Sequence, residues 1–244
     1  MAEPKAQTPR REEPPSLLAG TFAFAIKLVH GLLVAFVLAL LVECVGMTWW
    51  WPEEGTAHSR RLLDEESKYL GVTFRRHLFV HEPPRFAERV ATRLTHVVYE
   101  QTGLSRVHDW ATTPPGPNEP GPKAYVHRFA NRLAGYLLCV KQTAQLFGLR
   151  LAVIVLALPS VVLCGLVAVV DGLVRRDLRR WGGGRESGFV YHWAKRLALP
   201  LSVGIWVIYL ALPVSLAPPL IVVPFSLVLG LFVAATVGAF KKYL

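Results

Sequence analysis

Two histidines, His77 and His81, are the first residues in the chain whose spacing could support chemistry. Side chains four positions apart share one face of a helix, so this pair could hold a metal ion. A zinc protease needs a glutamate directly after the first histidine, and Leu78 stands there instead. We therefore interpret both as surface histidines near a helix end, and we expect no metal and no other cofactor.

A second candidate for chemistry begins at Asp171-Gly172. These residues, with Arg176, resemble the start of the metal-binding motif of CDP-alcohol phosphatidyltransferases, although Arg175 stands where the motif has alanine. Phe189 stands where that motif has a further aspartate. A two-metal phosphoryl site needs several carboxylates, and Asp171 and Asp177 are too few to build one.

The glycines at 183 and 188 have the spacing of a phosphate-binding loop, but Phe189 occupies the position of the essential lysine. The sequence also has no Gly-x-Ser-x-Gly element for a nucleophilic serine. We therefore expect that the protein is not an enzyme.

The composition indicates a membrane protein. Apolar residues make up 52% of the 244 residues, whereas 18% are charged and the net charge is +10. A soluble domain of this size is rarely so apolar. In a membrane chain, a positive balance reports topology more often than nucleic-acid binding.

Four apolar segments are long enough to cross a bilayer as helices. They cover residues 22–47, 149–170, 197–216 and 220–240. Prolines at 218 and 219 predict a tight helical hairpin between the last two. The first segment is followed by Thr48 and three tryptophans rather than by a signal-peptide cleavage site, so we interpret it as an anchor with an interfacial aromatic belt.

Basic residues in the short segments predict the orientation. The tail 1–21, which we expect to be disordered, the loop 171–196 and the tail 241–244 all carry lysine or arginine and fall on one side of a four-span protein. We therefore expect both termini in the cytoplasm of a bacterial inner membrane. Residues 48–148 then face the periplasm.

The periplasmic segment 48–148 has helical periodicity. Leu63, Leu70, Phe74 and Leu78 share one face of a helix that starts at Pro52, and a second helix is expected from about Pro84 to Thr102. A proline-rich linker, 112–123, precedes a third helix that continues into the second span. The predicted fold is thus an all-α membrane protein with four transmembrane helices and a helical periplasmic insertion between spans 1 and 2.

The cytoplasmic loop 171–196 contains more than topology requires. It combines seven basic residues with a glycine triplet and aromatic side chains. Packing against lipid headgroups is one interpretation, and docking of a cytoplasmic partner is the other. For docking, interfaces draw most of their energy from arginine and aromatic anchors, and the candidates are Asp171, Arg175, Arg176, Arg179, Arg180, Gly183, Arg185, Phe189, Tyr191 and Trp193.

Single polar residues near the span ends allow simple interpretations. We expect Arg150 to extend its charge toward water and Glu43 to be solvated at the interface, although a buried acid can also mark an ion path. Cys44 and Cys139 are expected near the same membrane face. Either a disulfide or two buried thiols is compatible with that placement.

The chain resembles an inner-membrane protein family of integrating conjugative elements, encoded beside the TraD-type coupling ATPase. The resemblance is carried by Glu43-Cys-Val-Gly-Met47 with Trp51-Pro52, by the loop VDGLVRRDLRRWGGGRESGFVYHWAK, by Tyr209–Ser215 and by Phe240–Leu244. It implies a non-enzymatic component of conjugative DNA transfer, associated with type IV secretion and working as a scaffold or adaptor for the coupling ATPase.

The expected partners are membrane lipids, the coupling ATPase and other type IV secretion components, and a homo-oligomer is compatible with the sequence. Direct nucleic-acid binding is not expected, because the loop's cations would meet anionic lipid first. The alternative function is a small membrane transporter or an enzyme of lipid metabolism. Spans two to four lack the mid-span charges that a transporter usually needs.

Overall fold

All regular elements in the described part of the chain are helices. The computed structural model describes residues 17–74, 80–113, 121–182 and 188–239. In chain order the elements are α1 (Leu17–Val45), the π-helix η1 (Gly46–Trp50), α2 (Thr56–Thr73), α3 (Pro83–Thr95), the π-helix η2 (His96–Gln101), α4 (Leu104–Thr112), α5 (Gly121–Trp181), α6 (Gly188–Ala211) and α7 (Pro218–Gly238).

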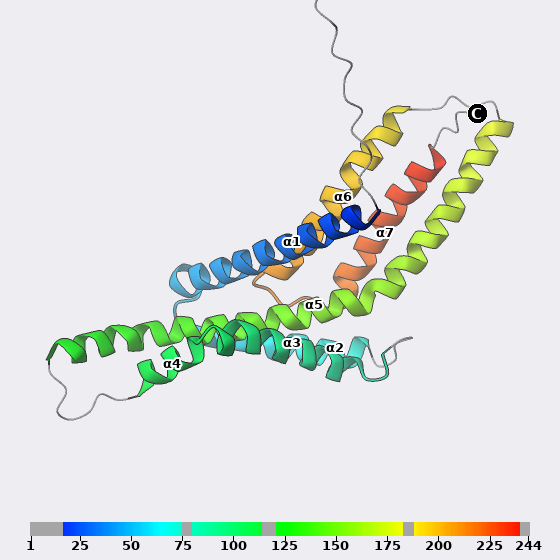
Figure 1. Ribbon diagram of the computed structural model, residues 1–244. Coiled ribbons are helices and arrows are strands. Elements are labelled where there is room, and N and C mark those ends of the chain that lie inside the picture. The colour runs from blue at the N-terminus through cyan, green and yellow to red at the C-terminus, as the bar shows by residue number, and fades with distance from the viewer. Residues whose placement is uncertain (1–16, 75–79, 114–120, 183–187, 240–244) are drawn as a thin grey trace, which may run out of the picture.

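The helix α5 organises the molecule. It has 61 residues and is therefore about 90 Å long at 1.5 Å per residue. Its first half packs against α2, α3 and α4, and its second half packs against α7 and α6 (Figure 1). The helix bends between the two halves, where Pro159 removes one backbone hydrogen bond. The prediction that the helix after the 112–123 linker continues without interruption through residues 149–170 is confirmed.

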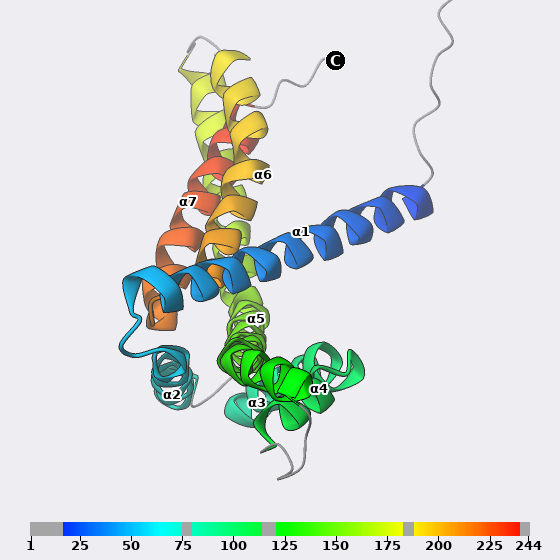
Figure 2. The same ribbon diagram turned by 90° about the vertical axis from the view of Figure 1, so that its left-hand side faces the viewer.

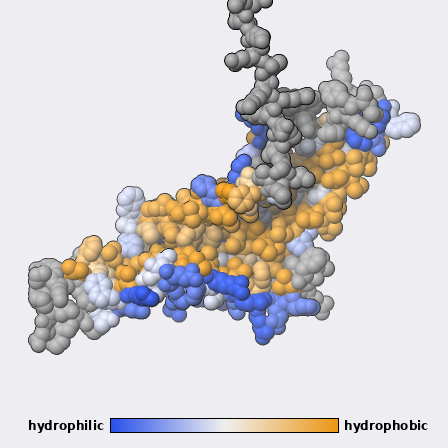
Figure 3. Space-filling model, viewed as in Figure 1, coloured by the Kyte–Doolittle hydropathy of each residue, from blue (hydrophilic) through white to orange (hydrophobic). Residues whose placement is uncertain are grey.

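Three of the described helices are long and apolar enough to cross a membrane: Gly20–Trp50, Leu133–Trp181 and Pro218–Gly238. They correspond to the first, second and fourth expected spans. The third expected span, 197–216, overlaps α6 only as far as Ala211, where α6 ends. The apolar part of α6, Pro200–Ala211, is shorter than the other three helices, so a fourth crossing stays a prediction. The apolar surface of these helices is continuous in Figure 3.

The N-terminal half of α1 stands away from the other helices. Both ribbon views show α1 crossing α6 and then extending beyond it (Figures 1 and 2). Residues 20–30 are all exposed, and Phe22 and Val29 keep 70% and 65% of their surface. Only the C-terminal half packs, through Ala35 and Ala39 against Phe147 and Leu210.

The helices α2 and α3 pack on α5, each through the face that carries its buried residues. Leu70 of α2 is buried, and Leu63 and Phe74 pack against the same cluster, as the periodicity predicts; Leu78 lies outside the described residues. In α3 the buried residues are Pro83, Ala87, Ala91 and Thr95, whereas the sequence pattern emphasises the larger Phe86 and Val90.

Close approach explains this difference. A Cβ on Gly148 of α5 would lie 2.5 Å from the Cα of Ala91, so the two helix backbones nearly touch there. Large side chains such as Phe86 and Val90 then pack beside the contact rather than within it. Interfaces built on small residues are a way for helices to approach closely.

Some predicted boundaries are displaced. The helix expected from Pro52 begins at Thr56, after a turn. The helix expected over 84–102 is α3 followed by η2, and Gly103 ends it with φ 81°. Of the expected linker 112–123, residues 114–120 lie outside the described chain and 121–123 already belong to α5. The short helix α4 was not predicted.

Candidate functional site

A buried arginine joins three parts of the fold. Arg150 of α5 is 1% exposed, and its guanidinium donates to both carboxylate oxygens of Glu66 on α2, with Nε at 2.9 and 3.2 Å. Its Nη1 and Nη2 donate to four backbone carbonyls at the end of α6 and in the following turn, those of Tyr209 (3.1 Å), Leu210 (3.3 Å), Leu212 (2.6 Å) and Val214 (2.9 Å).

These bonds satisfy groups that a helix end leaves without partners. The last carbonyls of α6 have no intrahelical donor, and a cation near a helix C-terminus is also favoured by the helix dipole. Burial raises the pKa of the Glu66 carboxyl, while the Arg150 guanidinium opposes that rise. Our expectation that Arg150 extends toward water is therefore wrong: its charge is compensated inside the protein.

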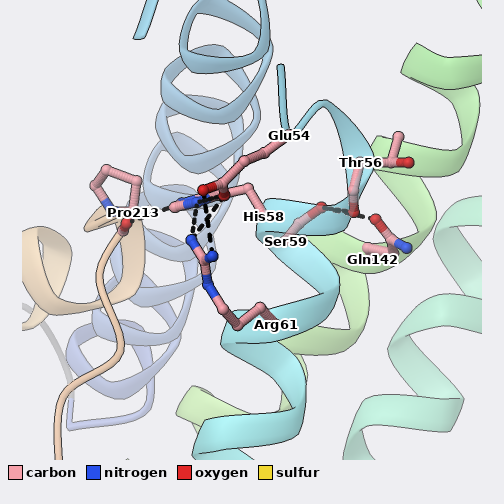
Figure 4. A network of polar contacts seen from close by, with 7 residues as sticks. All are labelled: Glu54, Thr56, His58, Ser59, Arg61, Gln142 and Pro213. Carbon is pink, nitrogen blue, oxygen red and sulfur yellow. Dashed lines mark hydrogen bonds and ion pairs between the residues drawn. The ribbon is translucent and has the colours of Figure 1, made fainter. Parts of the chain in front are cut away.

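A second set of contacts ties the chain after α1 to the same turn. The Trp51 ring stacks on His58, with centroids 4.0 Å apart, and a ring nitrogen of His58 lies 3.3 Å from the carbonyl of Pro213. Arg61 donates to Glu54 and lowers the pKa of that carboxyl. Figure 4 shows His58, Glu54 and Arg61 gathered beside Pro213.

Gly46 makes room for Trp51. A Cβ on Gly46 would overlap the Trp51 indole, at 1.9 Å from its nearest atom, so only glycine fits there. Trp49 and Trp50 are 79% and 64% exposed, as expected for an interfacial belt. Trp51 departs from that expectation because its ring is used for internal packing.

Glu43 of α1 lies in the same region and is 4% exposed. Its Oε1 has no hydrogen-bond partner in the described part of the protein. It lines a cavity of about 10 Å³ together with Thr143, Arg150 and Leu212, which is close to the lower limit for one water molecule. The expectation that Glu43 is solvated at the interface is therefore wrong.

A buried hydrogen bond adds a further link between α2 and α5. The Ser59 hydroxyl donates to Oε1 of Gln142 at 2.7 Å (Figure 4). We call the whole set the outer junction, defined by Glu43, Trp51, His58, Ser59, Glu66, Gln142, Arg150 and the 209–214 carbonyls. Within the described ranges, no three His, Cys, Asp or Glu side chains are arranged to hold a metal. The polar contacts of the outer junction link helices to one another and to the α6–α7 turn.

The predicted docking residues that α5 carries, Asp171, Arg175, Arg176, Arg179 and Arg180, lie near its C-terminal end. Asp171 accepts an ion pair from Arg175 at 2.8 Å, and Asp177 lies 3.6 Å from Arg176. Six helical positions separate the two aspartates by about 120° around α5. The two carboxylates therefore point in different directions from α5, and each is paired with a neighbouring arginine.

The remaining docking candidates are only partly described. Arg175, Arg179 and Arg180 belong to the last two turns of α5, which ends at Trp181. Gly183 and Arg185 lie outside the described residues. Phe189, Tyr191 and Trp193 belong to the backbone of α6, but the structure does not describe their side chains. The docking role of this set stays a prediction.

The three cysteines are free. The side chains of Cys44 on α1 and Cys139 on α5 lie close enough to interact, so α1 and α5 approach each other at this level. Cys164 donates to the Ser226 carbonyl of α7 at 3.2 Å.

The outer junction brings together two sequence segments that carry the family resemblance, 43–52 and 209–215. The decisive comparison is with family models. The model described as "IncC plasmid conjugative DNA transfer protein DtrJ-like" matches residues 50–241. The chain belongs to the DtrJ-like family. The resemblance to a conjugative transfer family is thereby confirmed.

For this DtrJ-like protein, neither the curated proteins nor the solved structures give a significant match. The family match covers α2 to α7 and most of the outer junction, including Glu66 and Arg150. It does not cover Glu43 or Gly46 on the first apolar segment.

Proposed function

We propose that this DtrJ-like protein is a non-enzymatic inner-membrane component of conjugative DNA transfer that acts as a scaffold or adaptor for the coupling ATPase of a type IV secretion system. The observation that carries the proposal is the continuity of α5. One helix leads from the outer junction to an end that bears Arg175, Arg176, Arg179 and Arg180. The family match supports the process, and three helices fit a membrane location.

An adaptor has to hold a surface in a fixed place. The outer junction supplies rigidity, because Arg150 fixes α2 and the α6–α7 turn to α5. The basic end supplies a surface for recognition, since arginine is frequent among the residues that dominate interface energies. The element that carries the partner is thereby positioned by contacts about 45 Å away along α5.

The membrane alternative, a small transporter, has one observation in its favour. Glu43 and Arg150 are buried charged residues, and such residues often mark ion paths. Arg150, however, is fully engaged by Glu66 and four backbone carbonyls at the end of α6 and in the α6–α7 turn. Its hydrogen bonds fix the backbone of residues 209–214 to α5, which is a structural role.

Capture of the partner in cells tests the adaptor role. Trp181, at the end of α5, is 92% exposed and can be replaced by a photo-crosslinking amino acid. In donor cells we expect the coupling ATPase to be captured from position 181. The matched control is position 49, another exposed tryptophan, at the other end of the molecule. Equal capture from both positions, or none from 181 in a stably inserted protein, contradicts the proposal.

A loss-of-function test separates docking from topology. Phe189, Tyr191 and Trp193 are changed together to alanine while all arginines of the loop are kept. If the loop docks a partner, DNA transfer falls and the crosslink from position 181 disappears. Reporters at Gly116 and Leu244, expected in the periplasm and the cytoplasm, verify that the variant keeps its topology. Normal transfer by the inserted variant returns the loop to a topological role.

A further inference from the structure

A groove opens between the C-terminal ends of α5 and α7, and the arginines that line it belong to α5. Its volume is about 670 Å³, within the range of small-molecule sites. One part of its lining is cationic and the rest is aliphatic or small. The lining residues are Arg175, Leu178 and Arg179 from α5 and Leu231, Ala234, Ala235, Gly238 and Ala239 from α7.

The groove follows from how the two helices meet. A Cβ on Gly172 would lie 2.8 Å from the Ala234 carbonyl oxygen, so the backbones are in close contact there. Small residues on α7 leave a shallow trough beside this contact. Leu178 and Leu231, 66% and 67% exposed, stand at the trough without a protein partner covering them. The result is an open groove whose base is formed by apolar side chains.

The cations are arranged to receive an anion. Arg179 donates from Nε to the Arg175 carbonyl at 3.4 Å, and its Nη2 lies 3.7 Å from the place where a Cβ of Gly238 would be. In the part of the chain that the structure describes, no carboxylate lies within salt-bridge distance of Arg179, whereas Arg175 has Asp171. Among the described residues, the Nη1 and Nη2 atoms of Arg179 have no carboxylate partner, and this fork can bind a phosphate in bidentate fashion.

We propose that this groove binds an anionic phospholipid, with its phosphate on Arg179 and Arg175 and an acyl chain along Leu178, Leu231 and Ala235. The inference rests on the membrane location of α5 and α7 and on no other part of the proposed function. A nucleic-acid backbone offers the same phosphate chemistry, but it has no apolar group for the aliphatic floor. Basic pockets between membrane helices fit anionic lipid headgroups for this reason.

Lipid titration of the purified full-length protein in detergent, read by native mass spectrometry, tests the site. The probe is phosphatidylglycerol. Each cation near an anionic headgroup contributes roughly a factor of five in affinity, so Arg175→Gln with Arg179→Gln should weaken binding about 25-fold. The matched control is Arg176→Gln with Arg180→Gln, which removes the same charge from residues outside the groove. Equal losses in both pairs overturn the proposal.

Two further arms separate the groove from simple charge attraction. Ala235→Phe fills the floor and leaves both arginines in place, so it should also abolish retention of the lipid. Val228→Phe, on α7 outside the groove lining, should not. Glycerol phosphate, which has the headgroup charge without acyl chains, should bind far more weakly than the lipid. Unchanged binding by Ala235→Phe, or equal affinity for glycerol phosphate, overturns the proposal.

These measurements do not depend on the adaptor role. Lipid retention is read on the isolated protein, so a chain that fails to capture the coupling ATPase can still show the site. Conversely, the protein can still capture its partner while both arginine double variants lose lipid affinity equally. That result would rule out the lipid site and leave the proposed function standing.

Discussion

The guanidinium of Arg150 and the carboxylate of Glu66 form a bidentate ion pair although 84 positions separate them in the chain. Both side chains are almost completely buried, at 2% and 5% exposure. A buried ion pair by itself is weak evidence for stability, because removing two charges from water is costly. Here the arginine also donates to four carbonyls, so its role extends beyond the pair.

Replacing Arg150 by methionine should destabilise the protein strongly. The change leaves the Glu66 carboxylate buried without a counter-charge and the 209–214 carbonyls without their donor. Removing one partner of a buried pair costs about 3–5 kcal/mol. Thermal unfolding in detergent measures the effect. The control is Arg61→Met, which removes an exposed ion pair with Glu54 and should cost less than about 1 kcal/mol. Similar stability of the two variants contradicts the assigned role.

A double replacement distinguishes the pair from the carbonyl contacts. In a simple buried ion pair, apolar residues at both positions often restore stability. We expect Arg150→Met with Glu66→Leu to recover only part of the loss, because the carbonyls still lack a donor and a buried unsatisfied group costs about 1–3 kcal/mol. Full recovery would show that the carbonyl bonds contribute nothing measurable.

Gly148→Ala should loosen α3 from α5. The new Cβ would meet backbone atoms of Ala91, which cannot move aside as a flexible side chain can. Overpacking of this kind costs about 1–3 kcal/mol, and proteolysis of the outer helices should become faster. Gly135→Ala is the control on the same helix, where nothing lies within 4 Å. That change should be neutral or slightly stabilising, since alanine favours helix over glycine.

Cys44 and Cys139 should form a disulfide under a mild oxidant such as copper phenanthroline. Their side chains lie close enough to interact, and forming the bond transfers two electrons from the thiols to the oxidant and releases two protons. The count of reactive thiols in denaturant should fall from three to one, leaving Cys164. The cross-link closes a long loop and should raise the free energy of unfolding by about 2–4 kcal/mol. Cys44→Ser serves as the control, and a fall in its thiol count would contradict the pairing.

Periodicity predicted the helices because it depends on neighbours in sequence. Leu63, Leu70 and Phe74 repeat on one face, and the structure buries that face. The continuation of α5 through the second span followed in the same way. The close contact of Ala91 with Gly148 could not be predicted, since small residues give almost no hydrophobic signal and the contact depends on how two distant helices cross.

The outer junction was missed for a related reason. Arg150 stands beside a long apolar run, and a single arginine there is compatible with extending toward water. What fixes it is Glu66, far away in sequence, and backbone carbonyls that exist as acceptors only because α6 ends at Ala211. The signals that could have revealed it were the buried face of α2, which includes Glu66 between Leu62 and Leu70, and the early end of α6.

The unbroken length of α5 has a mechanical consequence. No loop interrupts the backbone between Gly121 and Trp181, so the part held by α2 and α3 and the part bearing the arginines behave as one lever. Pro159 is its weakest point, because the missing backbone hydrogen bond lowers the resistance to bending there. Arg150, which fixes α5 to α2 and to the α6–α7 turn, lies nine residues before Pro159 and is the point about which α5 would bend. A force applied at either end is therefore carried along covalently continuous backbone rather than dissipated in a flexible connection.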